Sequence, residues 1–102
     1  MRALRVGDVG FDEVVNAGRV KWVGTEQGEL LVVPKWVQGR EIAHTVLTGG
    51  RPVLAAGEAE IATGGGRRLG IEITNYSGHY LPSGARLQIG RSAFEVAGIV
   101  FP

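Results

Sequence analysis

The chain has 102 residues, enough to bury one modest hydrophobic core and too few for two, so we expect residues 1–102 to form a single domain. Its apolar fraction of 44% and charged fraction of 21% exclude wholesale disorder, and the net charge of +1 excludes a global field that would attract nucleic acid. The chain has no cysteine, which excludes disulfides and thiolate chemistry, and we find no apolar run of membrane-spanning length and no signal-peptide block at the start.

The first eighteen residues predict a short segment followed by a helix. Leu4 and Val6 fit either an edge strand or a loosely held segment within 1–10. Residues 11–18 predict one or two helical turns, because Asp12 and Glu13 suit a helix start and Gly18 suits the position just past a helix end.

Residues 19–25 and 29–37 predict a hairpin around the turn at 26–28, where Gly28 supplies a positive φ. Trp22 and Trp36 are its large side chains, and we expect them to be buried or half-buried, with a binding platform as the alternative. Pro34 removes a backbone donor from the second strand, which therefore reads as an edge strand or a bulged one.

Residues 38–50 form the irregular part of the chain, where a short helix would carry His44 and Thr45 partly off its buried stripe. A second hairpin follows, with strands at 52–62 and 69–76. Matching the apolar rows of these strands places Ile61 opposite Leu69 and Ala59 opposite Ile71.

This register puts Glu58 directly opposite Glu72, and like charges across a ladder are destabilising unless one carboxylate has a raised pKa or a cationic neighbour. Glu58 is therefore a candidate general base. The alternative is a solvated polar face whose acids are neutralised by nearby arginines; the candidates are Arg51, Arg67 and Arg68.

Residues 83–98 predict a helix that Ser83 caps and Gly98 ends, and the tail 99–101 fits a further strand. The order of elements indicates an α+β domain in which an antiparallel sheet of about four strands carries a packed C-terminal helix. Residues 1–18 then form the N-terminal segment and helix, and residues 19–102 form the sheet and the C-terminal helix.

The strand at 69–76 leads into a polar corner with the sequence Ser-Gly-His-Tyr, which holds the candidate residues Ser77, His79 and Tyr80. His44 and His79 are the only histidines of the chain. Two groups that titrate near neutrality suffice to cleave RNA through its 2′-hydroxyl without a metal or cofactor, provided that a cation stabilises the phosphate. The usual phosphate-binding loop, the serine hydrolase elbow and the zinc protease helix are all absent from the sequence.

Three runs, at 44–47, 50–58 and 75–82, resemble the C-terminal domains of bacterial polymorphic toxins and related secreted effectors, which have a His-(Ser/Thr) pair, an Ala-Gly-Glu strand and a Ser-Gly-His-Tyr-x-Pro corner. The resemblance covers roughly residues 20–102, and its most specific part is the corner. Small toxin domains of this shape are often metal-independent ribonucleases of the barnase, EndoU, colicin and RelE-like group. The resemblance implies His44 and His79 as the acid–base pair, Glu58 as a second base or orienting group, and Tyr80 or Thr45 as phosphate contacts.

The resemblance implies RNA and a cognate immunity protein as partners. It also implies a place in the cytoplasm, either of the producing cell or of a target cell reached through a secretion system. We expect Arg51 and Ser77 to help bind the substrate, and no cofactor or metal to be needed. ADP-ribosyl transfer by the His-Tyr pair and a glutamate is another effector chemistry, and a non-catalytic binding module is the alternative outside enzymes, with His79 and Tyr80 bonded to the backbone.

Overall fold

The structure is a computed structural model that describes residues 3–75 and 84–102. Strands β1 (Val20–Thr25), β2 (Leu30–Pro34), β5 (Val53–Gly64) and β6 (Arg67–Thr74) form an antiparallel sheet in the order β2-β1-β5-β6. A separate two-stranded ribbon contains β3 (Trp36–Val37) and β4 (Arg40–Glu41). The helices are α1 (Phe11–Ala17), α2 (Thr45–Thr48) and α3 (Gly84–Val96). The expected α+β fold, with about four antiparallel strands and a C-terminal helix, is confirmed.

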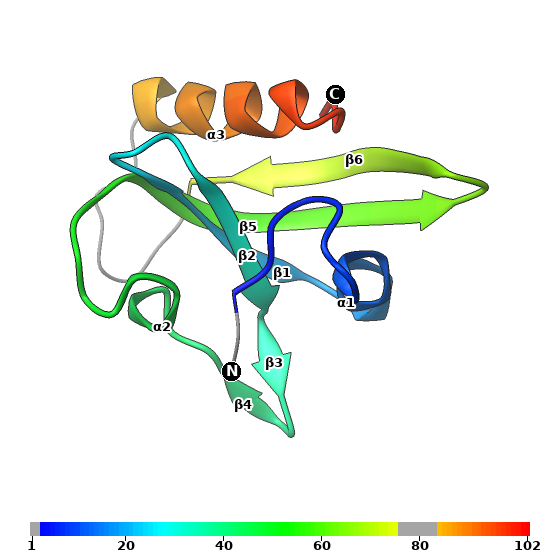
Figure 1. Cartoon of the computed structure of the whole chain (residues 1–102), viewed down its shortest axis with the longest axis horizontal. Helices are drawn as coiled ribbons and strands as arrows, with labels where there is room; N and C mark the ends of the chain where they lie inside the picture. Colours follow the sequence, from blue (N-terminus) through cyan, green and yellow to red (C-terminus); the bar gives the residue numbers. More distant parts are fainter. Residues whose placement is uncertain (1–2, 76–83) are drawn as a thin grey trace.

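The helices lie on different sides of the sheet (Figure 1). Helix α3 runs along one face, where it contacts β5, β1, β6 and β2. Helix α2 and the β3–β4 ribbon lie on the other side of the sheet, and α1 packs against β5 and β2. The sheet therefore has one face covered by a long helix and one face covered only in part.

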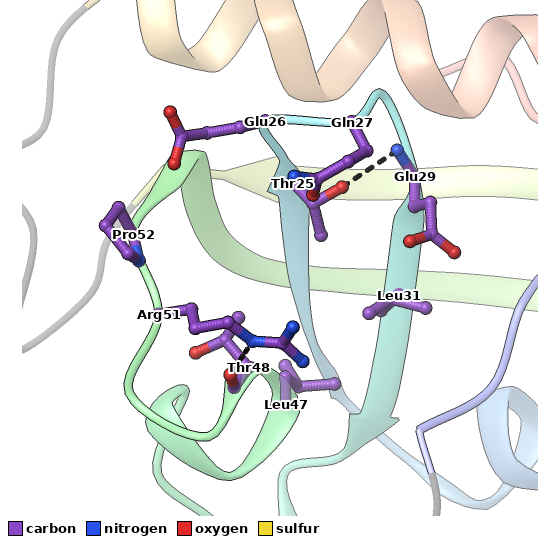
Figure 2. Close-up of a pocket in the computed structure, with 9 residues that line it drawn as sticks. All are labelled: Thr25, Glu26, Gln27, Glu29, Leu31, Leu47, Thr48, Arg51 and Pro52. Atoms are coloured by element: carbon purple, nitrogen blue, oxygen red, sulfur yellow. Dashed lines mark hydrogen bonds between the residues drawn. The ribbon is translucent and has the colours of Figure 1, made fainter.

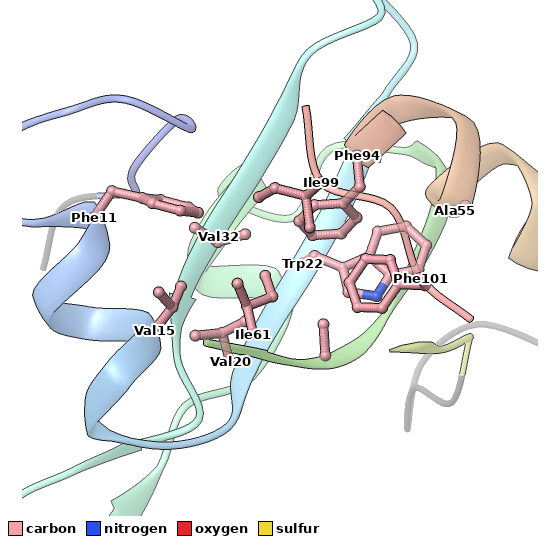
Figure 3. Close-up of a cluster of buried hydrophobic side chains, with 11 residues drawn as sticks. Phe11, Val15, Val20, Trp22, Val32, Ala55, Ile61, Phe94, Ile99 and Phe101 are labelled. Carbon is pink, nitrogen blue, oxygen red and sulfur yellow. The ribbon is translucent and has the colours of Figure 1, made fainter. Parts of the chain in front are cut away.

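The main core lies between the sheet, α3 and α1, and Figure 3 shows its side chains. Trp22 and Phe94 are fully buried and meet edge to face, with ring centroids 6.2 Å apart. Phe94 also packs against Phe101 at 5.2 Å. Gly90 allows α3 to approach this closely, because a Cβ at position 90 would overlap the Trp22 ring. A bulky aromatic ring on the sheet and a glycine on the helix thus fix the distance between the two layers.

The N-terminal helix and the first hairpin agree with the sequence. Helix α1 has Asp12 and Glu13 in its first turn and is followed by Gly18. Pro34 lies on β2, which is an edge strand of the sheet. The segment 29–37 is split, however, into β2 and β3 at Lys35. Trp22 is fully buried as expected, whereas Trp36 is 55% exposed on the ribbon. Near the N-terminus, Leu4 pairs with Val32 through one isolated bridge.

The predicted register of the second hairpin is wrong by one position next to the turn and by two positions beyond a bulge. The turn has two central residues, Gly65 and Gly66, both at positive φ, so Gly64 pairs with Arg67 and the register moves by one position. A β-bulge beside Glu60 and Ile61 then adds one unpaired residue, Ile71, to β6. As a result Ala59 lies opposite Ile73 and Ile61 opposite Gly70, while Glu58 lies opposite Thr74 and Glu60 opposite Glu72.

The new register changes which residues face the core. Leu69 and Ile71, expected in the buried row, are exposed on β6. Gly70 takes the inward position, where a Cβ would lie only 2.6 Å from Val100 O. The tail is not a strand: Ile99 and Phe101 are instead buried in the main core. In the part of the chain that the structure describes, no helix is both long and apolar enough to cross a membrane.

Candidate functional site

The partly covered face of the sheet carries a charged group centred on Glu58, in the middle of β5. The Glu58 side chain is 13% exposed, and its Oε1 atom accepts hydrogen bonds from Arg19 Nε at 2.9 Å and Lys35 Nζ at 3.0 Å. Its second oxygen, Oε2, accepts no hydrogen bond from any residue that the structure describes. Glu58 is thus paired with two cations through Oε1 and retains Oε2 as a further hydrogen-bond acceptor.

Arg19 connects this carboxylate to two others. Its guanidinium donates to Glu60 Oε1 at 3.3 Å and to Glu72 Oε1, so one arginine spans three acids on β5 and β6. The hydrogen bond to Glu72 is the main reason why the pKa of Arg19 is raised. We call the group of Arg19, Lys35, Glu58, Glu60 and Glu72 the Glu58 cluster. The like charges that face each other across the ladder are Glu60 and Glu72, and Arg19 neutralises them.

A second ion pair lies next to the Glu58 cluster. Lys21, on β1, pairs with Glu58 in the strand register, and its Nζ lies 2.7 Å from Glu41 Oε2 on the β3–β4 ribbon. The Lys21 side chain is only 7% exposed. The hydrogen bond from Lys21, reinforced by its charge, lowers the pKa of Glu41. This pair ties the ribbon to the partly covered face of the sheet.

His44 is buried, with an exposed fraction of 2%, which corrects the expectation that it lies partly off the buried side of its helix. Its Nε2 donates to Gly57 O over 2.7 Å. A ring nitrogen that donates to a backbone carbonyl carries its proton in that bond, so it cannot take a proton from a substrate at the same time. The position of His44 therefore fits a role in holding β5, and less well the role of an exposed acid or base.

Gly57 joins three parts of the chain that are distant in sequence. Its carbonyl accepts the hydrogen bond from His44, and a Cβ at position 57 would overlap Thr74 O and lie 2.8 Å from Asn75 Cα. Next to it, Glu58 N donates to Thr74 Oγ1 at 3.3 Å. We call the group of His44, Gly57, Thr74 and Asn75 the Gly57 junction. It brings together His44, the Ala-Gly-Glu strand and Asn75, which is the first residue of the run at 75–82.

The other predicted site residues are placed as follows. Arg51 lies just before β5, at the opposite end from the Glu58 cluster, and donates from Nε to Thr48 O at 3.1 Å. Thr45 begins α2, and its side chain lies outside the described part of the structure. Ser77, His79 and Tyr80 also lie outside the described residues.

Three cations near Glu58 are absent from the predicted site: Arg19, Lys21 and Lys35. The predicted neutralising residues are not the ones found, since Arg68 pairs with Asp12 at 2.7 Å and Arg51 points elsewhere. Side chains alternate along β1, so Lys21 lies on the same face of the sheet as Val23 and opposite Glu58. This alternation is the sequence signal that could have placed a cation beside Glu58. Among residues 3–75 and 84–102, no three side chains of His, Cys, Asp or Glu gather closely enough to hold a metal ion.

Comparison with known proteins gave no match to any family model, any curated protein or any solved structure.

Proposed function

We propose that the chain is a metal-independent endoribonuclease in which Glu58 is the general base. The observation that carries the proposal is the Gly57 junction, because His44, Gly57 and Asn75, one residue from each of the three runs singled out in the sequence, meet there beside Glu58. Catalytic residues from separate parts of a chain must converge in space, and runs that serve only as local turns need not.

The proposed roles follow from the environment of each group. Arg19 and Lys35 donate to Glu58 Oε1 and orient the carboxylate, and its Oε2 accepts the proton of the 2′-hydroxyl. In this mechanism the same two cations stabilise the negative charge that builds up on the attacked phosphate. His44 is a positioning residue that holds the backbone at Gly57. His79, the other histidine, protonates the leaving 5′-oxygen.

The test is incubation of mixed cellular RNA with the purified protein in EDTA, followed by analysis of the RNA ends. Wild type should give 2′,3′-cyclic phosphate ends. Glu58→Gln and His79→Ala should each lose about 100-fold or more in rate, as expected for removal of a general base or acid. Glu60→Gln is the matched control, because Glu60 also contacts Arg19 but is 53% exposed, and it should stay close to wild type. Intact RNA with wild type, or cleavage by Glu58→Gln at the wild-type rate, contradicts the proposal.

A second candidate is a non-catalytic protein-binding module, and strand β6 favours it. Strand β6 is at the edge of the sheet and pairs only with β5 among the described residues. Leu69 and Ile71 are 58% and 48% exposed there, which suits the addition of an extended strand from a partner such as a cognate immunity protein. In the Glu58 cluster, moreover, both cations already have acidic partners.

The two candidates are separated by one double variant. A binding module leaves RNA intact in EDTA and loses its partner when Leu69 and Ile71 are both replaced by Lys, because charged side chains oppose edge pairing. A ribonuclease retains its activity in that double variant, because neither residue belongs to the Glu58 cluster or the Gly57 junction.

A further inference from the structure

A separate cavity lies at the other end of β5, between the turn that joins β1 to β2 and the segment that follows α2. Its volume is about 140 Å³, and Figure 2 shows the side chains that line it. One wall is formed by the turn and β2, with Thr25, Glu26, Gln27, Glu29 and Leu31, and the other wall consists of Leu47, Thr48, Arg51 and Pro52. Strands advance about 3.3 Å per residue, so this cavity is roughly 20 Å from Glu58.

Arg51 is the cation of this cavity. Gly49 and Gly50 both have positive φ and turn the chain back, so that Thr48 O accepts hydrogen bonds from both Arg51 N at 3.3 Å and Arg51 Nε at 3.1 Å. This pair of bonds orients the guanidinium, and its two terminal nitrogens extend past Thr48 toward Leu31 and Leu47 in Figure 2. Among the described residues no carboxylate lies within ion-pair distance of Arg51.

Thr48 adds a second donor without an acceptor. The residue lines the same cavity and is only 5% exposed, and its Oγ1 atom has no hydrogen-bond partner in the described part of the chain. A buried hydroxyl without a partner is destabilising, and such groups are rare in folded proteins. An oxygen anion would supply acceptors both to this hydroxyl and to the terminal nitrogens of Arg51.

Two acidic residues, Glu26 and Glu29, also line the cavity, and neither pairs with Arg51. Glu29 is already paired with Arg5, and Thr25 Oγ1 accepts a hydrogen bond from Glu29 N at 3.0 Å. Glu26 stands at the rim, and Figure 2 shows its carboxylate pointing away from Arg51. The remaining walls include the apolar side chains Leu31, Leu47 and Pro52.

From the unpaired guanidinium, the buried hydroxyl and the apolar walls, we propose that this cavity binds a small organic carboxylate. The carboxylate accepts hydrogen bonds from Arg51 and Thr48, and a short aliphatic chain packs against Leu31 and Leu47. A cavity of this volume holds a molecule the size of propionate or butyrate and no larger cofactor. Inorganic phosphate offers the same oxygen acceptors without an aliphatic part, and it serves as the comparison ligand.

The experiment is a titration of the intact protein with sodium propionate, followed by NMR chemical shifts and by thermal unfolding, with sodium chloride at equal ionic strength as the reference. Propionate should saturate with a Kd of about 1 mM and raise Tm, because a ligand that binds only the folded state stabilises it. Phosphate should bind more weakly, because it makes no apolar contact. A phosphate affinity equal to or above that of propionate contradicts a carboxylate site, and the absence of any saturating response to propionate overturns the proposal.

Three variants locate the site. Arg51→Met should weaken propionate binding at least tenfold. Thr48→Val removes the hydroxyl while keeping the shape, so it should weaken binding severalfold and leave the fold intact. Glu26→Gln is the control, since removing a rim acid should leave binding unchanged or tighter. Unchanged affinity in Arg51→Met contradicts the proposal. None of these variants alters the Glu58 cluster, so failure here and failure of the ribonuclease proposal are separate results.

Discussion

The two faces of the sheet are stabilised in different ways. On the face under α3, large apolar side chains are fully buried, and the close approach of Gly90 to Trp22 fixes the packing. On the other face, a smaller apolar cluster under α2 gives way to the Glu58 cluster and the Lys21–Glu41 pair. Shape decides the structure of the first face, and the pairing of charges decides that of the second. We therefore expect substitutions on the first face to change stability most and substitutions on the second to change function.

The largest effect should come from the helix-covered face. Phe94→Ala removes a fully buried ring that contacts both Trp22 and Phe101, and it should lower the free energy of unfolding by about 3–5 kcal/mol. Val96→Ala, on the same helix but 91% exposed, should stay within about 0.5 kcal/mol of wild type. Urea denaturation of both variants measures the difference, and equal losses would show that α3 does not pack as described.

On the other face, His44→Ala should lower the free energy of unfolding by about 1–3 kcal/mol, because it leaves Gly57 O without its buried donor. His44→Gln offers an amide N–H in place of the imidazole and should recover part of this loss. If His44 is a positioning residue, the ribonuclease activity of the two variants should follow the recovery of the fold. Stability unchanged in His44→Ala would show that the hydrogen bond to Gly57 contributes little.

Glu58→Gln should cost about 1–2 kcal/mol, since Arg19 and Lys35 both lose their charged acceptor at a partly buried position. Adding Lys35→Met to Glu58→Gln should cost less than the sum of the two single changes, because the second change removes a cation that the first left unpaired. A double-mutant cycle in urea measures this coupling. Strict additivity would mean that the charges on this face act independently.

The Lys21–Glu41 pair should make stability depend on pH in the acid range. Lys21 lowers the pKa of Glu41 in the folded protein, so the unfolded state binds the proton first as pH falls. The stabilisation is present above the ordinary pKa of a glutamate and is lost as pH falls through that value to the lowered one. In Lys21→Met the contribution of Glu41 to this slope should become much smaller, because Lys21 is the main cause of the lowered pKa. Denaturation midpoints of both proteins from pH 7 to the acid range test the sign, and an unchanged slope would contradict the pair.

The smallest effect on stability is expected at Trp36, on the β3–β4 ribbon. Trp36 is 55% exposed and Trp22 is buried, so Trp36→Phe should remove the long-wavelength part of the fluorescence and change the free energy of unfolding by less than about 0.5 kcal/mol. The remaining emission should be that of a buried indole. A larger loss of stability would indicate that the ribbon contributes to the core.

Prediction and structure agree best where an element is determined by interactions between residues close in sequence. Helix α1, the first hairpin and helix α3 were predictable, because caps, turns and apolar periodicity act within a few residues, as at Gly18, Gly28 and Gly98. The second hairpin was predicted as a pair of strands, but its register failed. The three consecutive glycines at 64–66 allow more than one placement of the tight turn, and the bulge at Ile71 has no signature in the sequence, so matching apolar rows alone gave the wrong register.

The sequence by itself determined the α+β class, the helices α1 and α3 and the two hairpins, and it marked the runs at 44–47, 50–58 and 75–82. The tertiary structure decided that His44 is buried, that Arg19 spans three acids, and that Leu69 and Ile71 face outward. The physical reason is distance along the chain. Arg19 reaches Glu58, Glu60 and Glu72 across 39 to 53 residues, and no local pattern encodes such contacts until the sheet is formed.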